Sequence, residues 1–168
     1  MIEITKENID KLFAKLDSDT RKSSYFLNPD SDFTRELVEG LIANESRYGY
    51  QACPCRLAAG DRNEDIDIIC PCDYRDADLD DFGACYCALY VSKDIAEGKT
   101  TAQPLPDRRP VKREERPQFR EKKVGKGYSE LSHPVWRCRV CGYLAARDEP
   151  PGVCPICKAT KDRFDRFM

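Results

Sequence analysis

Histidine is almost absent from this sequence, since His133 is the only one among 168 residues. Tryptophan and methionine are also rare, with one and two residues. Any metal chemistry must therefore rest on thiolates. No apolar run approaches the roughly twenty residues that a membrane-spanning helix needs, so we expect no membrane insertion. The first residues lack the basic and apolar stretches of a secretory signal. We therefore expect a cytoplasmic protein.

Cysteine, in contrast, is abundant, with ten residues in the chain. In a reducing cytoplasm, cysteines at this density are expected to be metal ligands or catalytic thiols rather than structural disulfides. The length allows one ordinary domain or two small ones. Small domains commonly depend on metals for their stability. We expect small metal-stabilised domains.

The net charge of −2 hides a strong asymmetry along the chain. Residues 1–98 carry 11 basic and 21 acidic side chains, whereas residues 99–127 carry 10 basic and 4 acidic ones. The second stretch also contains four prolines and few large apolar residues, which is typical of a linker. The basic segment is expected either to lie along the acidic part or to recruit an acidic partner.

Two N-terminal stretches have the spacing of amphipathic helices. Thr5 is a suitable N-cap for the first, which we expect to end at residues 17–19. Asn28 and Pro29 are suited to the cap and first turn of the second, and Gly49 to its end. The predicted apolar faces consist of Ile9, Leu12, Phe13 and Leu16, and of Phe33, Leu37, Val38, Leu41 and Ile42.

Regular periodicity fades between residues 51 and 91. Residues 73–82 hold five aspartates and are predicted to form a short solvent-facing helix or loop. So irregular a segment keeps one conformation only if something other than secondary structure ties it together, and a metal cluster would do so. We therefore expect a mainly α domain wrapped round a cluster.

Four cysteines form two Cys-x-x-Cys pairs near the C-terminus, separated by residues 142–153. This spacing is a specific signal for a tetrahedral four-thiolate site. The predicted ligands are Cys138, Cys141, Cys154 and Cys157. His133 lies outside this unit and is interpreted as a surface or packing residue.

The residues around these pairs resemble rubredoxin, especially the short form fused to rubrerythrins. The resemblance is carried by Trp136, Cys138, Val140, Cys141, Gly142, Tyr143, Pro151, Val153, Cys154, Pro155, Cys157, Lys161, Asp162 and Phe164. It implies a small β domain with one mononuclear iron that changes oxidation state. A structural zinc is the alternative, because zinc fits the same four thiolates.

The other six cysteines form three Cys-x-Cys pairs: Cys53 and Cys55, Cys70 and Cys72, Cys85 and Cys87. Six thiols are two more than a 4Fe-4S cubane needs, so four ligands and a two-cysteine redox pair would account for all of them. Two zinc sites with shared ligands, or three disulfides, would also use six. Zinc sites usually prefer Cys-x-x-Cys turns, and a reducing compartment disfavours disulfides.

These pairs and their surroundings resemble the catalytic chain of ferredoxin:thioredoxin reductase and the related ferredoxin:disulfide reductases. The matching residues, over about residues 20–95, are Tyr25, Phe26, Asn28, Pro29, Glu39, Gly40, Leu41, Gly49, Pro54, Arg56 and Pro71 together with the six cysteines. The resemblance implies that Cys53, Cys70, Cys72 and Cys85 hold a 4Fe-4S cluster. It also implies that Cys55 and Cys87 form the active-site disulfide.

One departure from the family concerns residue 86, where the family usually has histidine and this chain has Tyr86. An unperturbed tyrosine titrates near pH 10, so water, a carboxylate or the Tyr86 hydroxyl would have to deliver protons. Arg56 could favour a thiolate at Cys55, although an arginine in a polar loop is more often solvated. The loop between the last two pairs is also longer and more acidic than is usual in the family.

The resemblances divide the chain into three parts. We expect a domain like the ferredoxin:thioredoxin reductase catalytic chain at residues 1–98, a basic proline-containing linker at 99–127 and a rubredoxin-like domain at 128–168. The expected function is reduction of thioredoxin-like protein disulfides with electrons from ferredoxin or a similar one-electron donor, relayed by the rubredoxin-like domain. An iron-sulfur electron carrier without disulfide reductase activity is the alternative. A zinc adaptor that binds nucleic acid is disfavoured, because the acidic part would repel phosphate.

Overall fold

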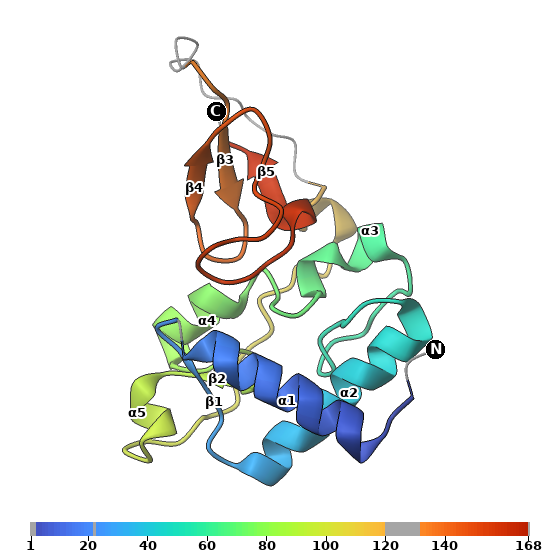
Figure 1. Ribbon diagram of the computed structural model, residues 1–168, viewed down its shortest axis with the longest axis vertical. Coiled ribbons are helices and arrows are strands. Elements are labelled where there is room, and N and C mark those ends of the chain that lie inside the picture. Colours follow the sequence, from blue (N-terminus) through green and yellow to red (C-terminus); the bar gives the residue numbers. More distant parts are fainter. Residues whose placement is uncertain (1–2, 22, 120–131, 168) are drawn as a thin grey trace.

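A computed structural model describes residues 3–21, 23–119 and 132–167. A helical body, residues 3–119, carries a smaller strand-rich unit, residues 132–167, on one side (Figure 1). The expected start of the rubredoxin-like domain at residue 128, and the end of the linker before it, lie outside the described residues. In the described part, no helix combines the length and the apolar character that a membrane crossing requires.

Helix α1 spans Lys6–Thr20 and has the predicted N-cap, since the Thr5 side chain accepts a hydrogen bond from the Asn8 amide. The helix continues slightly beyond the predicted end at residues 17–19. Leu12, Phe13 and Leu16 pack against the core of the body, as the spacing predicts. α1 lies against α2 and covers one side of the body (Figure 1).

Helix α2 spans Ser31–Tyr48 and ends at Gly49, which has φ +81°. Its N-cap is Asp30 rather than the predicted Asn28, because the Asp30 carboxylate accepts hydrogen bonds from the backbone amides of Asp32 and Phe33. The Asn28 side chain accepts from the Asp30 amide and donates to the Ala88 carbonyl, so it ties the helix to the third cysteine pair. Phe33 is 37% exposed, contrary to its predicted place on the apolar face.

Short elements complete the body. They are β1 (Phe26–Leu27), α3 (Arg62–Asp65), η1 (Ile66–Ile68), α4 (Arg75–Phe82), β2 (Tyr90–Val91), α5 (Lys93–Ala96) and η2 (Arg113–Glu115). β1 pairs antiparallel with β2. An isolated antiparallel bridge joins Ala52 to Ile69, next to the first two cysteine pairs. Most of the cysteine-bearing segment is therefore loop, as the missing periodicity predicts.

The aspartate-rich segment forms helix α4, but it is not simply solvent-facing as predicted. Arg75 and Asp78 on this helix are buried. The Arg75 guanidinium binds the Asp76 carboxylate at 2.5 Å and donates to the Tyr25 hydroxyl at 2.8 Å. Charged side chains can be buried when they are paired with an opposite charge or a hydrogen-bond partner. The spacing of apolar residues does not predict such burial.

Residues 107–118 of the basic segment, called the strap below, lie along the acidic body. Arg108 binds Asp78 and Asp81, and Arg109 binds Asp65 and Asp67. Both Asp65 and Asp67 are fully buried. The basic segment was expected either to lie along the acidic part or to recruit an acidic partner. The strap lies along the body.

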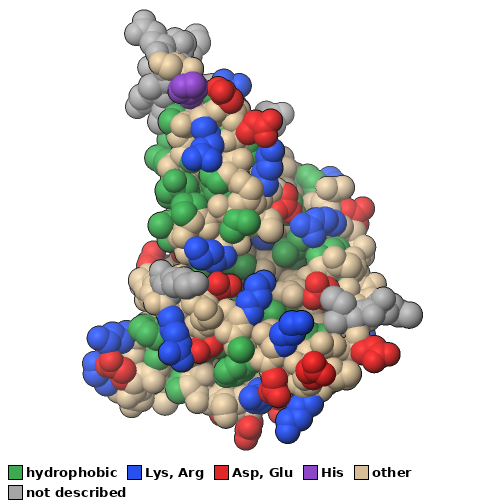
Figure 2. Space-filling model, viewed as in Figure 1, with side chains coloured by type: hydrophobic (Ala, Val, Ile, Leu, Met, Phe, Trp, Pro, Cys, Tyr) green, Lys and Arg blue, Asp and Glu red, His purple; other side chains and the backbone are tan. Residues whose placement is uncertain are grey.

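The strand-rich unit is a three-stranded antiparallel sheet in the order β4-β3-β5, with a 3-10 helix, η3, before the last strand. The elements are β3 (Val135–Cys138), β4 (Leu144–Ala146), η3 (Lys161–Arg163) and β5 (Phe164–Arg166). Figure 2 shows hydrophobic side chains gathered on the visible flank of this unit, whereas charges of both signs are mixed over the body. His133 is an exposed residue paired with Asp148 at 3.0 Å.

Candidate metal and disulfide centres

The four C-terminal cysteines come together in the strand-rich unit. The Cys138 and Cys157 sulfurs are 3.6 Å apart, and those of Cys141 and Cys154 are 3.5 Å apart. All four sulfurs lie within 4.8 Å of one another. Three of the residues are buried and Cys141 is half-buried. This arrangement brings together the whole predicted ligand set.

Local backbone geometry explains this convergence. Each Cys-x-x-Cys pair is followed by a left-handed residue, Gly142 with φ +76° and Lys158 with φ +63°. The amides of these residues donate to the Cys138 and Cys154 carbonyls, which closes both turns. Hydrogen bonds from the thiols of Cys141 and Cys157, and then from backbone amides, lower the pKa of Cys138. Four converging sulfurs with such support fit a mononuclear metal site.

The central cysteines surround a small cavity within the body. Its walls are formed by Cys53, Cys70, Cys72, Cys85, Cys87, Arg75 and Tyr90. Backbone hydrogen bonds hold these segments together, from Cys53 to Ile68, from Cys70 to Gln51 and from Cys85 to Tyr90. The three Cys-x-Cys pairs therefore meet although they are distant in sequence.

Cys55 differs from the other central cysteines because it is exposed and does not line this cavity. Its thiol makes hydrogen bonds with Cys53 and Cys87, and these lower the pKa of Cys55. Cys87 is buried and its sulfur also lies 3.6 Å from that of Cys85. Cys55 and Cys87 thus form an adjacent pair with one member facing solvent and the other facing the cavity.

The cavity is not a single-ion site of the C-terminal kind. Among the residues that the structure describes, the C-terminal cysteines are the single group of three or more such side chains close enough to share one ion. The central sulfurs are spread round a space instead. Burial, as the largest cause, raises the pKa of both Cys70 and Cys72. A metal cluster, which contains several metal ions, fits this arrangement of thiols better than one zinc ion.

Arg56, which follows Cys55 directly, is 7% exposed rather than solvated. Its guanidinium donates to the Cys72 sulfur at 3.3 Å and binds Asp107 of the strap at 2.9 Å. It also lies 4.4 Å from the centroid of the Tyr86 ring. Arg56 therefore connects all three cysteine pairs, since it follows the first, contacts the second and stacks on the residue between the cysteines of the third.

Tyr86 is half-buried beneath this guanidinium. Its backbone amide donates to the carboxylate of Asp78, whose pKa is raised chiefly by burial. Arg108 of the strap binds the same carboxylate at 2.6 Å. The strap thus reaches two of the cysteine-bearing segments, the first pair through Asp107 and Arg56 and the third pair through Arg108 and Asp78.

Sequence reasoning missed three charged residues around the centre, namely Arg75, Asp78 and Asp107. Tyr90 donates its amide to the Cys85 sulfur at 3.3 Å, and its hydroxyl lies 3.7 Å from the Cys70 sulfur. For the charged residues, the sequence offered one signal: a basic segment follows an acidic one. This difference in charge does not show which side chains pair.

Two stretches of the chain match known protein families. Residues 3–114 match the family described as ferredoxin thioredoxin reductase catalytic beta chain. The chain belongs to this family. The match includes all three Cys-x-Cys pairs and the first part of the strap. Members of the ferredoxin thioredoxin reductase catalytic chain family are oxidoreductases, and the sequence resemblance is confirmed at this level.

A curated relative is the ferredoxin-thioredoxin reductase catalytic chain of Pyropia yezoensis, which is 26% identical over 91 residues. The aligned part covers 52% of this chain and 74% of the relative. Residues 136–165 match the rubredoxin-like domain of rubrerythrin. The chain is therefore a reductase catalytic-chain domain followed by a rubredoxin-like domain, as the motifs predict.

Proposed function

We propose that this protein reduces protein disulfides with electrons received one at a time, and that Cys55 and Cys87 are its redox-active pair. The observation that carries the proposal is the position of this pair: exposed Cys55 contacts buried Cys87, and Cys87 borders a cavity lined by four further cysteines. A target disulfide can reach the first thiol, while the second faces the source of electrons.

Cys53, Cys70, Cys72 and Cys85 are the proposed ligands of a 4Fe-4S cluster, which the helical body encloses. They lie on the walls of one cavity, and four thiolates are the usual donor set for such a cluster. When bound, the cluster supplies single electrons next to the cysteine pair. The same reasoning assigns one mononuclear iron to Cys138, Cys141, Cys154 and Cys157, a site that zinc also fits.

The chain's own residues perform the thiol chemistry. Cys55, as the exposed thiol, attacks the target disulfide and forms a mixed disulfide with one target sulfur, while the other target sulfur leaves. Cys87 then attacks Cys55, which releases the reduced target and forms the Cys55–Cys87 disulfide. Two electrons and two protons restore the dithiol. The net reaction is the reduction of one target disulfide to two thiols.

Arg56 and Tyr86 flank this pair. The buried guanidinium of Arg56 places a positive charge beside the cysteine segments, which favours thiolate forms during exchange. The Tyr86 hydroxyl is a proposed proton donor in place of the histidine usual in the family. The partners that follow from the family are a ferredoxin as donor and a thioredoxin-like protein as target.

Metal and acid-labile sulfide analysis tests the cofactors directly. Protein purified without oxygen should contain about five irons and about four sulfides per chain, for one cubane and one mononuclear site. Zinc without sulfide would overturn the redox proposal and return the central cysteines to a structural role.

A trapping experiment tests the cysteine roles. With Cys87→Ser, the mixed disulfide cannot be resolved, so a thioredoxin-like protein should remain bound to the chain through Cys55. Mass spectrometry of the adduct identifies the bond. An adduct through a different cysteine would refute the assignment. If the native protein forms no dithiol that reduces an external disulfide, it is an electron carrier instead.

The rubredoxin-like domain is proposed to relay electrons from the donor to the central site. Zinc in its four-cysteine site keeps the tetrahedral geometry but has no accessible redox change. The zinc-loaded chain should therefore reduce disulfides slowly with a ferredoxin donor and normally with reduced methyl viologen. Equal rates with ferredoxin for the zinc and iron forms would leave the domain without a relay role.

A further inference from the structure

The rubredoxin-like unit contacts the body through a small set of polar groups. Arg163 of η3 donates to the Ile69 carbonyl at 2.8 Å and binds the Asp73 carboxylate. Arg139 lies 3.5 Å from the same carboxylate. Ile69 and Asp73 flank the second cysteine pair, so these arginines hold the unit directly against a segment of the central site.

The Arg163–Asp73 pair is buried, with side chains 2% and 3% exposed. The two residues come from different units, and the pair is buried where the units meet. Removing one partner of such a pair leaves an uncompensated buried charge, so the pair strongly favours one docked arrangement over others. A more exposed pair, Arg62 with Asp162 at 2.6 Å, joins the same two units.

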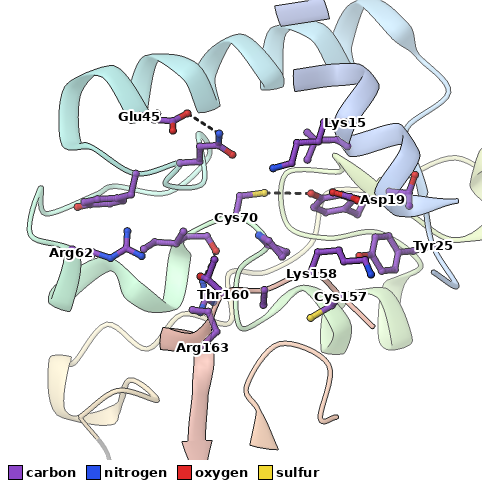
Figure 3. A pocket seen from close by; sticks show the side chains of 18 of the residues that line it. Lys15, Asp19, Tyr25, Glu45, Arg62, Cys70, Cys157, Lys158, Thr160 and Arg163 are labelled. Carbon is purple, nitrogen blue, oxygen red and sulfur yellow. Dashed lines mark hydrogen bonds between the residues drawn. The ribbon is translucent and has the colours of Figure 1, made fainter. Parts of the chain in front are cut away.

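A cavity of about 270 Å³ lies at this junction. Two cysteines line it, Cys70 from the body and Cys157 from the rubredoxin-like unit. Figure 3 shows these two side chains at the same pocket, together with Tyr25 and Arg163. One proposed ligand of each metal site therefore borders the junction, whereas Cys55 lies away from it and remains exposed.

Two tyrosines of the body connect the sides of this cavity. The Tyr90 hydroxyl lies 3.7 Å from the Cys70 sulfur. The rings of Tyr90 and Tyr25 meet edge to face with centroids 5.3 Å apart. Tyr25 and Cys157 both line this cavity. The Arg75 guanidinium is 4.2 Å from the Tyr25 centroid and 5.6 Å from that of Tyr90, which fixes both rings.

We propose that the Arg163–Asp73 pair holds the rubredoxin-like unit in a fixed docked position, and that electrons pass from Cys157 to Cys70 along Tyr25 and Tyr90. This inference rests on the relay role proposed above. Each transfer oxidises the C-terminal site by one electron and reduces the central site by one. The one-electron donor replaces each electron, and two transfers with two protons reduce one Cys55–Cys87 disulfide. Tyr25, Tyr90 and Arg163 are positioning residues in this scheme.

The docking contact is tested with Arg163→Ala in the full-length iron-loaded protein, with Lys161→Ala as its control. Lys161 lies on the same 3-10 helix but pairs with Glu149 inside its own unit. We expect Arg163→Ala to lower the docked-to-undocked ratio by about a hundredfold, as loss of a buried ion-pair partner does. Small-angle X-ray scattering should then show a larger maximum dimension, and Lys161→Ala should match the wild type.

The same variants are compared by stopped-flow absorbance, which follows electron transfer from the C-terminal site to the central site. Arg163→Ala should slow this transfer about tenfold or more, because fewer molecules are docked. Arg163→Lys should recover part of the rate, since it restores the charge without the planar guanidinium. An unchanged scattering curve or an unchanged transfer rate for Arg163→Ala overturns the docking proposal.

The tyrosine path is tested with Tyr25→Leu, with Tyr25→Phe as its control. Tyr25→Phe keeps the ring between the two cysteines, whereas Tyr25→Leu removes it. Transfer should slow severalfold in Tyr25→Leu alone, with the scattering curve and both visible spectra unchanged. If the Leu and Phe variants transfer electrons equally fast, the ring has no role in the path.

Failure of this inference is separate from failure of the proposed function. Disulfide reduction driven by reduced methyl viologen bypasses the rubredoxin-like unit, so Arg163→Ala should retain it. A wild-type protein that cannot reduce disulfides with viologen contradicts the proposed function. In that case the scattering comparison still decides whether Arg163 docks the unit.

Discussion

The two cysteine centres of this chain are built in different ways. In the rubredoxin-like unit, two short turns within about twenty residues of chain bring four sulfurs to within 4.8 Å of one another. In the body, five cysteines of three separate pairs line one cavity, and backbone hydrogen bonds together with buried charge pairs to the strap hold those loops in place. The first centre therefore depends on local backbone geometry and its metal, and the second on long-range charge pairing.

The largest expected effect separates the chemistry of the two centres. Cys55→Ser should lower disulfide reduction by about four orders of magnitude, because the attacking thiol is lost. Iron and sulfide contents should not change, because Cys55 is exposed and outside the cavity. Viologen-driven reduction of a thioredoxin-like disulfide measures the activity. A parallel loss of sulfide would mean that Cys55 is a cluster ligand.

Loss of a C-terminal ligand tests whether that unit depends on its metal. Substitution of a residue that only supports a metal ligand lowers metal affinity about 10–100-fold. Cys138→Ser removes a ligand itself and should lower the affinity further. The three-stranded sheet should lose its order, since ligand binding and folding are coupled in such small units. Metal analysis and NMR spectra report this, while the sulfide content of the body stays constant. An ordered sheet without metal would contradict the comparison.

The charge scaffold of the body is tested by Arg109→Ala. This change leaves Asp65 and Asp67, both fully buried, without their strap arginine and should cost about 3–5 kcal/mol in the free energy of unfolding. Denaturant titration of the intact protein measures the loss. Arg113→Ala is the matched control, because Arg113 is 59% exposed in its pair with Glu64, where water screens the charges, so the loss should be much smaller. Equal losses would refute a buried charge scaffold.

The smallest effect compares one glycine from each region. A methyl group at Gly40 would come within 2.8 Å of the Pro54 Cβ, between the first two cysteines of the body. Gly40→Ala should therefore cost about 1–3 kcal/mol through overpacking and disturb the visible spectrum of the central site. Gly152 in the rubredoxin-like unit has no such neighbour within 4 Å. Gly152→Ala should change stability by about 0.5 kcal/mol or less.

The elements that sequence predicted well are those with local causes. Helix α1 begins after Thr5 because the Thr5 hydroxyl accepts a hydrogen bond from the Asn8 amide, which has no partner within the helix. The start of α2 was predicted less well, because Asn28 and Asp30 are both suitable caps and Asn28 is used to bind the Ala88 carbonyl. The choice between two equivalent local signals was made by a distant contact.

Burial of charge was the main feature that sequence patterns could not show. Arg56 and Arg75 are in loops or on a short polar helix, where solvation is the ordinary expectation. Arg56 is buried against Asp107 and the Tyr86 ring, and Arg75 is buried against the rings of Tyr25 and Tyr90, all of which come from other segments. Such partners have no fixed spacing along the chain, so no periodicity reveals them.

The sequence by itself determined the two families, the position of all ten cysteines and the four-sulfur unit, because these depend on short spacings and on turns that close locally. Tertiary structure alone decided which central thiol faces solvent, where the strap lies and which surface of the body meets the rubredoxin-like unit. The physical reason is that each of these features depends on pairs of groups far apart in sequence. Such pairs gain their energy only when folding removes both partners from water.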